Sequence, residues 1–159
     1  MTPRVEIVEV AASERDALWR YLQFYIYDMT QFTGAQAEDG VFAYRFFNDY
    51  LQKGPGRGAF WAKVGGEIAG FALVKVDGDC QEVAEFFIVR RWRRRGIGHA
   101  FARQLLHRSP GPWKLHELAN NTAAIAFWRR VLQGFAPYTE APLAHTDGLG
   151  RIEQRFVVS

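Results

Sequence analysis

The chain of 159 residues contains a single cysteine, Cys80, so it cannot close a disulfide within itself. A lone thiol is typical of proteins that work in a reducing compartment, and we expect a cytoplasmic location. No apolar run approaches the roughly 18 residues that a membrane-spanning helix needs. The first residues also lack the apolar core of a signal peptide. We therefore expect no membrane partner.

Metal-binding and nucleotide-binding signatures are also missing. No group of His, Cys, Asp or Glu residues has the spacing of metal ligands, so we expect no metal cofactor. The Gly-Lys-Ser/Thr ending of a P-loop is absent, and Phe101 stands where a Rossmann fingerprint needs a third small residue. Both classes of nucleotide-binding domain are therefore disfavoured.

Positive charge is concentrated in one place. Five arginines lie between Arg90 and Arg95, directly before Gly96-Ile97-Gly98. A tract this basic could bind nucleic acid. However, the net charge is only +3, and the other close pair, Arg129-Arg130, does not build a wide basic footprint. We therefore expect no nucleic-acid partner and favour a small anionic ligand.

Hydrophobic periodicity predicts alternating strands and helices in a single domain over residues 1–159. Gly65-Gly66 and Asp77-Gly78 suit tight hairpin turns, so the three middle strands should form an antiparallel meander. A helix between two later strands should make them parallel through a right-handed crossover. We expect strands at 5–10, 59–64, 67–76, 81–89, 113–118, 135–140 and 152–158, and helices from Ser13, over 42–50, from Gly96 and after Asn121.

These elements make an α+β domain with a mixed, mostly antiparallel sheet, one parallel pair of strands and about four flanking helices.

The turn between the strand ending at Val89 and the next helix has the features of an anion site. Glycine permits tight turns and close backbone approach, and the first N–H groups of a helix lack partners. Such a turn suits a phosphate or pyrophosphate, with Arg93, Arg94 and Arg95 adding positive charge.

Two motifs resemble those of a known family. Arg93-Arg-Arg-Gly96-Ile-Gly98 follows a Glu-Phe-Phe-Ile-Val strand and resembles the acyl-CoA-binding signature (Gln/Arg)-x-x-Gly-x-(Gly/Ala) of the GNAT N-acetyltransferase superfamily. Asn121-Thr-Ala-Ala124-Ile-Ala-Phe127-Trp128, followed by Gly134-Phe135, is similar to the second motif of that family. The expected order of elements also matches the family fold along nearly the whole chain.

The resemblance implies acetyl-CoA as the acyl donor and an amine of a small molecule, peptide or protein as the acceptor, joined by direct attack in a ternary complex. It implies that the parallel strands splay and that the pantetheine arm fills the gap. Backbone N–H groups around 87–89 would stabilise the oxyanion. The implied cofactor contacts are Phe87, Ile88, Val89, Arg93, Arg94, Arg95, Gly96, Ile97, Gly98, His99, Asn121, Ala124 and Trp128.

Catalysis needs a base for the ammonium and a proton for the leaving thiolate. Glu82 and Glu85 are the candidate bases, because both lie on the strand that meets the acyl group. They are three positions apart, so only a bulge would bring them to one face of the sheet. Many relatives place a Tyr acid where this chain has Trp128, whose indole cannot give up its proton. Tyr138 or a water is the expected replacement.

The acceptor pocket of the family is shaped by the first helices and their loop. An aromatic and acidic lining there would suit a cationic amine. Tyr27 and Asp28 are the main candidates, and His116, on the strand beside the gap, is a third substrate contact. The other aromatic and acidic residues of this region are Tyr25, Phe32, Glu38 and Asp39.

Two other functions remain open. The departure at Trp128 also suits a CoA-binding regulatory module with little or no turnover. The arginine tract could instead serve nucleic-acid or protein interaction. In either case we expect a monomer or a homodimer.

Overall fold

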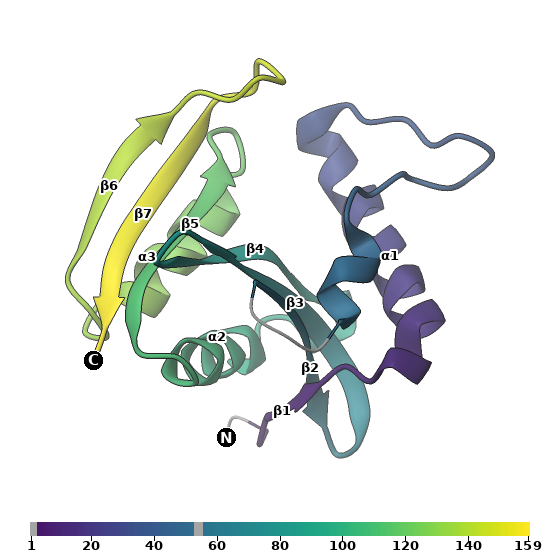
Figure 1. The fold of residues 1–159 in the computed structure, drawn as a ribbon, viewed down its shortest axis with the longest axis horizontal. Helices are drawn as coiled ribbons and strands as arrows, with labels where there is room; N and C mark the ends of the chain where they lie inside the picture. Colours follow the sequence, from purple (N-terminus) through teal and green to yellow (C-terminus); the bar gives the residue numbers. More distant parts are fainter. Residues whose placement is uncertain (1–2, 53–55) are drawn as a thin grey trace.

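The computed structural model describes residues 3–52 and 56–159. Seven strands form one mixed sheet in the order β1-β2-β3-β4-β5-β7-β6. Helix α1 covers one face, and α2 and α3 cover the other (Figure 1). The strands are β1 (Glu6–Glu9), β2 (Arg57–Val64), β3 (Glu67–Asp77), β4 (Cys80–Ile88), β5 (Gly111–Leu118), β6 (Tyr138–Leu143) and β7 (Arg151–Val158), and the helices are α1 (Arg15–Thr33), α2 (Ile97–His107) and α3 (Thr122–Leu132).

The predicted architecture is confirmed. Strands β2, β3 and β4 form the antiparallel meander, and β4 pairs with β5 in parallel. The last hairpin begins later than expected, at Tyr138 instead of Phe135. The reason is that the N–H groups of Phe135 and Ala136 both donate to the Leu132 carbonyl and still close the end of α3.

The parallel pair separates, as expected. Pairing between β4 and β5 covers only three positions and ends at Val83 and Leu115, although both strands continue. Strand β4 also contains a bulge, because Leu73 pairs with Glu85 whereas Val74 pairs with Val83. Ala84 is the extra residue, and the bulge lies at the point where the two strands part.

The first helix begins differently from the prediction. The helix expected from Ser13 is preceded by a capping box one turn earlier, in which Glu14 Oε1 accepts from the Ala11 N–H at 3.0 Å. The reciprocal bond runs from the Glu14 N–H to the Ala11 carbonyl. A 3-10 turn at Ala12–Glu14 then leads into α1. A glutamate has the extra methylene that this reach requires.

The helix predicted over 42–50 is also wrong. That segment contains only a 3-10 helix, Phe47–Leu51, preceded by Phe46 in the left-handed conformation at φ +62°. The Gln23 side chain donates to the Phe42 carbonyl at 2.9 Å and accepts from its N–H at 2.7 Å. These bonds compete with helical ones, so the apolar spacing serves burial of Phe47 and Tyr50 instead.

Two apolar cores hold the layers together. Leu18 and Leu22 of α1 pack with Trp61 and Phe71 on one face of the sheet. On the other face, α2 and α3 pack against a core that includes Trp113. None of the described helices combines the length and apolar character that a membrane crossing requires.

Candidate active site

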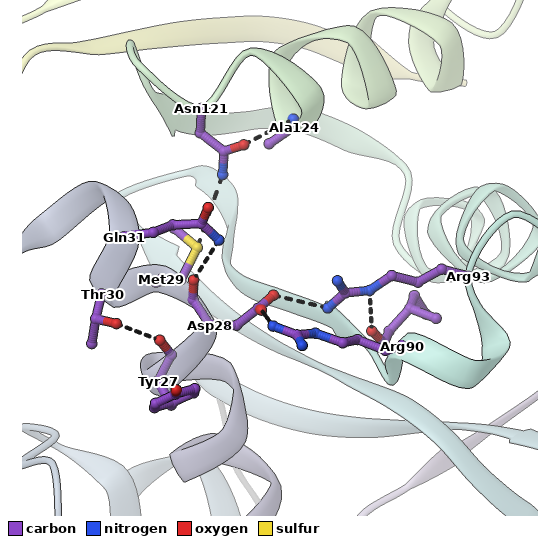
Figure 2. A network of polar contacts seen from close by, with 10 residues as sticks. Tyr27, Asp28, Met29, Thr30, Gln31, Arg90, Arg93, Asn121 and Ala124 are labelled. Atoms are coloured by element: carbon purple, nitrogen blue, oxygen red, sulfur yellow. Dashed lines mark hydrogen bonds and ion pairs between the residues drawn. The ribbon is translucent and has the colours of Figure 1, made fainter.

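A cleft of about 300 Å³ opens where β4 and β5 separate. Helix α1 supplies Tyr25, Met29 and neighbouring residues to its wall, and the first turn of α3 closes another side. The Asn121 side chain accepts from the Ala124 N–H at 3.2 Å and so caps α3, the helix expected after Asn121. Its amide also points toward α1, with Nδ2 at 3.9 Å from the Met29 sulfur (Figure 2).

The bulge in β4 places both candidate bases on one face of the sheet. Glu85 stands opposite Leu73, and Glu82 stands opposite Lys75, two residues further along β3. Residues two apart on a strand share a face, and so do directly paired residues. Glu82 and Glu85 therefore both face α1, which a regular strand would not allow.

Of these two glutamates, Glu82 is occupied by ion pairs. Its buried carboxylate lies 3.0 Å from Lys75 Nζ and 3.8 Å from Lys114 Nζ. Lys114 also bonds Asp77 at 2.6 Å. Glu82 does not line the cleft. Its contacts assign it to the joint between β3, β4 and β5.

Glu85 lines the cleft, and a hydrogen bond fixes the position of its carboxyl there. Its Oε1 accepts a hydrogen bond from the Tyr25 hydroxyl at 3.0 Å. Burial raises the pKa of Glu85 to about 7, although hydrogen bonds from Tyr44 and Tyr25 oppose the shift. A carboxyl with a pKa near neutrality can both accept and release a proton, which a general base requires.

A second buried carboxyl, Glu117, lines the cleft from the opposite face. It shares the alternation of Leu115 on β5, which packs into the core beneath α2 and α3. Glu117 is 5% exposed, and its Oε1 accepts from Gln154 Nε2 at 2.9 Å. Burial raises the pKa of Glu117 to about 7, against the effect of that hydrogen bond.

The buried pair formed by Glu117 and Gln154 has an unusual hydrogen-bond balance. Among the described residues, neither Glu117 Oε2 nor Gln154 Oε1 has a partner. Two buried acceptors without donors are costly. A proton on the Glu117 carboxyl converts one acceptor into a donor, so the surroundings favour the protonated acid.

The other predicted site residues divide into two groups. His116 and Trp128 line the cleft. Burial lowers the pKa of His116, so its imidazole is neutral at neutral pH. The buried Trp128 indole packs edge-on against Phe86 at a centroid distance of 5.0 Å. Tyr138 and Tyr27 are exposed residues that do not contribute to the cleft wall.

The turn before α2 presents free backbone donors. Within the described parts of the chain, the N–H groups of residues 94–99 donate no hydrogen bond to the protein. Gly96, at φ +78°, and Arg94, at φ +61°, adopt left-handed conformations, which turn the backbone from the end of β4 into α2. Gly98 has another role, because a Cβ there would lie 3.2 Å from the Phe127 ring. Its absence lets α2 pack against α3.

The strand before this turn shows which backbone groups face the gap. The Val89 N–H donates to the Ala69 carbonyl at 2.8 Å, so it faces β3. Because backbone groups alternate along a strand, those of Ile88 face the gap instead. The Ile88 carbonyl accepts from Arg93 Nε at 2.8 Å. Phe87 points into the core beneath α1.

Most of the arginine tract is already paired. Figure 2 shows Asp28 of α1 between Arg90 and Arg93, with N–O distances of 2.7 and 2.9 Å. Burial opposes ionisation of Asp28, but hydrogen bonds from the two arginines lower its pKa overall. Arg91 pairs with Glu67 at 3.3 Å, and the Arg95 guanidinium lies over the Trp92 ring. Asp28 is therefore neutralised before any amine arrives.

Two features of the site were not assigned from sequence. The bond from Tyr25 to Glu85 depends on how α1 crosses the bulged strand, which no local pattern reports. The sequence contains a weak indication of Glu117, because this carboxylate shares a strand face with the apolar residues Trp113 and Leu115. Over residues 3–52 and 56–159, no group of three or more His, Cys, Asp or Glu side chains could hold a metal ion.

Comparison with known proteins identifies the family to which this architecture corresponds. The model of the acetyltransferase (GNAT) family matches residues 20–135. A search of curated proteins found no match.

Solved structures match along nearly the whole chain. The ribosomal-protein-S18-alanine N-acetyltransferase from Escherichia coli is 20% identical, with a TM-score of 0.67 over 98% of this chain and 95% of that chain. Spermidine N-acetyltransferase from Vibrio cholerae, in complex with CoA and spermine, is 9% identical, with a TM-score of 0.71 over 97% and 95%. Arabidopsis thaliana NAA60, in complex with acetyl-CoA, is 14% identical, with a TM-score of 0.64 over 97% and 98%.

Proposed function

Since this chain belongs to the acetyltransferase (GNAT) family, we propose that it moves the acetyl group of acetyl-CoA to a primary amine of a small molecule, peptide or protein. The amine attacks directly in a ternary complex, without an acyl-enzyme. The observation that favours this reaction is Glu85, a buried carboxyl with a pKa of about 7, placed where β4 and β5 separate.

The turn before α2 suits the phosphates of the acyl donor. The free N–H groups of residues 94–99 lie at the positive end of the α2 dipole. Arg94 and Arg95 are the arginines of the tract that form no ion pair among the described residues. The backbone of Ile88 and the wall formed by Asn121, Ala124 and Trp128 are the surfaces for the pantetheine arm. Acetyl-CoA supplies the activated acyl group.

Glu85 acts as the base, directly or through a water. It takes a proton from the acceptor ammonium, and the neutral nitrogen then forms a bond to the carbonyl carbon. The Ile88 N–H, which faces the gap, stabilises the oxyanion. When the C–S bond breaks, the nitrogen of the tetrahedral intermediate releases its second proton to water, the electron pair of the C–S bond stays on sulfur, and the leaving thiolate takes a proton from Glu117.

The two carboxyls occupy opposite faces of the sheet, which separates their roles. Glu85 lies on the α1 face, where the acceptor enters. Glu117 lies on the face of α2 and α3, beside the predicted cofactor wall. Trp128 cannot donate a proton, and Tyr138 lies outside the cleft, so Glu117 is the acid that we assign.

Calorimetry with acetyl-CoA followed by a thiol-release assay tests this proposal. We expect binding at micromolar concentrations and free thiol that appears only when an amine is added. Absence of binding would end the proposal. Binding without turnover across a broad amine panel would favour the alternative, a CoA-binding regulatory module.

A further inference from the structure

We propose that the acceptor is a small monoamine with an uncharged body, and not a polyamine. This inference rests on the proposed acetyl transfer and names its substrate class. It comes from the balance of charges around the cleft, which differs from the acidic lining expected from sequence.

The carboxylates on the α1 side are compensated. Asp28 lies between Arg90 and Arg93, and Glu82 pairs with Lys75. Glu38 and Asp39, which the sequence placed in an acidic lining, are exposed loop residues that do not reach the cleft wall. Within residues 3–52 and 56–159, no carboxylate of α1 or of the loop after it lines the cleft without an ion pair, so a second ammonium entering along α1 would find no free carboxylate in the wall.

The carboxylates of the last hairpin are compensated as well. Glu153 pairs with Arg155 at 2.7 Å, and Glu140 forms an ion pair with Arg129. Asp147, in the loop before β7, accepts two bonds from Arg151, at 2.7 and 3.0 Å. Each of these acids already has its own arginine.

The cleft wall itself carries little negative charge. Glu85 and Glu117 are its carboxyls, and burial holds the pKa of each at about 7. The Arg151 side chain also lines the cleft and is 12% exposed, but it is paired with Asp147, so the pair adds neither a free carboxylate nor a free cation. Among the described residues that line the cleft, a second ammonium of a polyamine would therefore find no free carboxylate beyond Glu85 and Glu117, and an unpaired charge removed from water is costly.

The rest of the wall on the acceptor side suits an apolar body. Ile26, Met29 and Ala35 line it from α1 and the residues that follow, and Leu118 lines it from β5. An alkyl or aryl group attached to one amine can replace water along these side chains. Charge and lining thus favour the same class of acceptor.

A matched series of acceptors tests the inference. Initial rates with acetyl-CoA would be compared for hexylamine, 1,6-diaminohexane and spermidine at 0.15 M salt. We expect kcat/KM for hexylamine to exceed those of the other two at least tenfold. Equal or better use of the diamine would overturn the inference and leave acetyl transfer standing, whereas no acetylation of any amine would overturn both.

A designed change of charge provides the second arm. Ala35→Asp adds an uncompensated carboxylate to the cleft wall, and Ala35→Asn is the uncharged control of the same shape. Compared with the Asn variant, the Asp variant should raise the ratio of kcat/KM for the diamine to kcat/KM for hexylamine several-fold, because the two side chains differ in charge and not in shape. If Ala35→Asp does not change the ratio of diamine to monoamine, charge does not select the acceptor and the inference is wrong.

Discussion

The Tyr25 hydroxyl donates a hydrogen bond of 3.0 Å to the Glu85 carboxylate and so connects helix α1 to the bulge of β4. The bond stabilises the ionised form of Glu85, whereas burial favours the neutral form. Their balance keeps the pKa of the carboxyl near neutrality, at about 7. A residue of the acceptor-side helix thus sets the working range of the proposed base.

Tyr25→Phe should move the acidic limb of the pH profile of kcat/KM upward by about one pH unit, since hydrogen bonds to charged groups contribute roughly 1.5–3 kcal/mol. Loss of the bond leaves burial less opposed and raises the pKa of Glu85 further. Tyr21→Phe is the matched control, because Tyr21 lies on the same helix as Tyr25 but packs against Trp61 of β2 and does not contact Glu85. An unmoved acidic limb in Tyr25→Phe would rule out this positioning role.

Glu117→Gln should lower kcat by about tenfold or more, within the range of general acid catalysis. It should also remove the alkaline limb of the pH profile, because the wild-type acid must be protonated and its pKa is about 7. Affinity for acetyl-CoA should stay the same. Glu140→Gln is the control, since Glu140 also accepts a bond from Gln154 but does not line the cleft. Retention of the alkaline limb in Glu117→Gln would assign the thiolate proton to another donor.

The same carboxyl should make stability depend on pH. Its pKa is raised from 4.5 to about 7, so the folded state holds a proton that the unfolded state releases. The cost of burying Glu117 is therefore absent below pH 4.5 and fully present above about pH 7, reaching at most about 3 kcal/mol. Urea unfolding at pH 5 and pH 8 should show wild type losing more stability than Glu117→Gln. Equal losses would contradict the raised pKa.

Gly70→Ala should destabilise the protein by a few kcal/mol, a typical cost of forced repacking in a core. Gly70 lies on β3, and an added Cβ would stand 2.1 Å from the Phe87 carbonyl oxygen and 2.9 Å from the Ile88 side chain. Gly150→Ala is the control, since its nearest neighbour would be 3.7 Å away. Denaturant midpoints would measure both. A wild-type midpoint for Gly70→Ala would show that β3 and β4 can separate freely at this point.

Periodicity predicted the sheet well because strand and helix spacing reflect burial directly. The meander, the parallel pair and the Asn121 cap all follow from local patterns. The helix expected at 42–50 failed because tertiary contacts decided that segment: the Gln23 side chain holds Phe42, and Phe46 turns left-handed. Spacing alone cannot report a side chain from 19 residues earlier in the chain.

The site shows the same division. The anion site at the Gly96 turn could be predicted from the sequence, since a glycine directly before a helix indicates free backbone N–H groups. Sequence could not choose between Glu82 and Glu85, because the bulge at Ala84 depends on pairing with β3. It also could not show that Asp28 is neutralised by arginines more than 60 positions away. The net charge of the acceptor region could therefore be worked out only from the three-dimensional arrangement of its ion pairs.

The most direct test of the central claim is acceptor-dependent thiol release by wild type and Glu85→Gln, with acetyl-CoA affinity measured in parallel. Glu153→Gln serves as the control, because Glu153 pairs with Arg155 and lies outside the cleft. We expect Glu85→Gln to bind acetyl-CoA as wild type does and to lose at least a hundredfold in kcat, within the range for a general base. Wild-type turnover in Glu85→Gln would contradict the account.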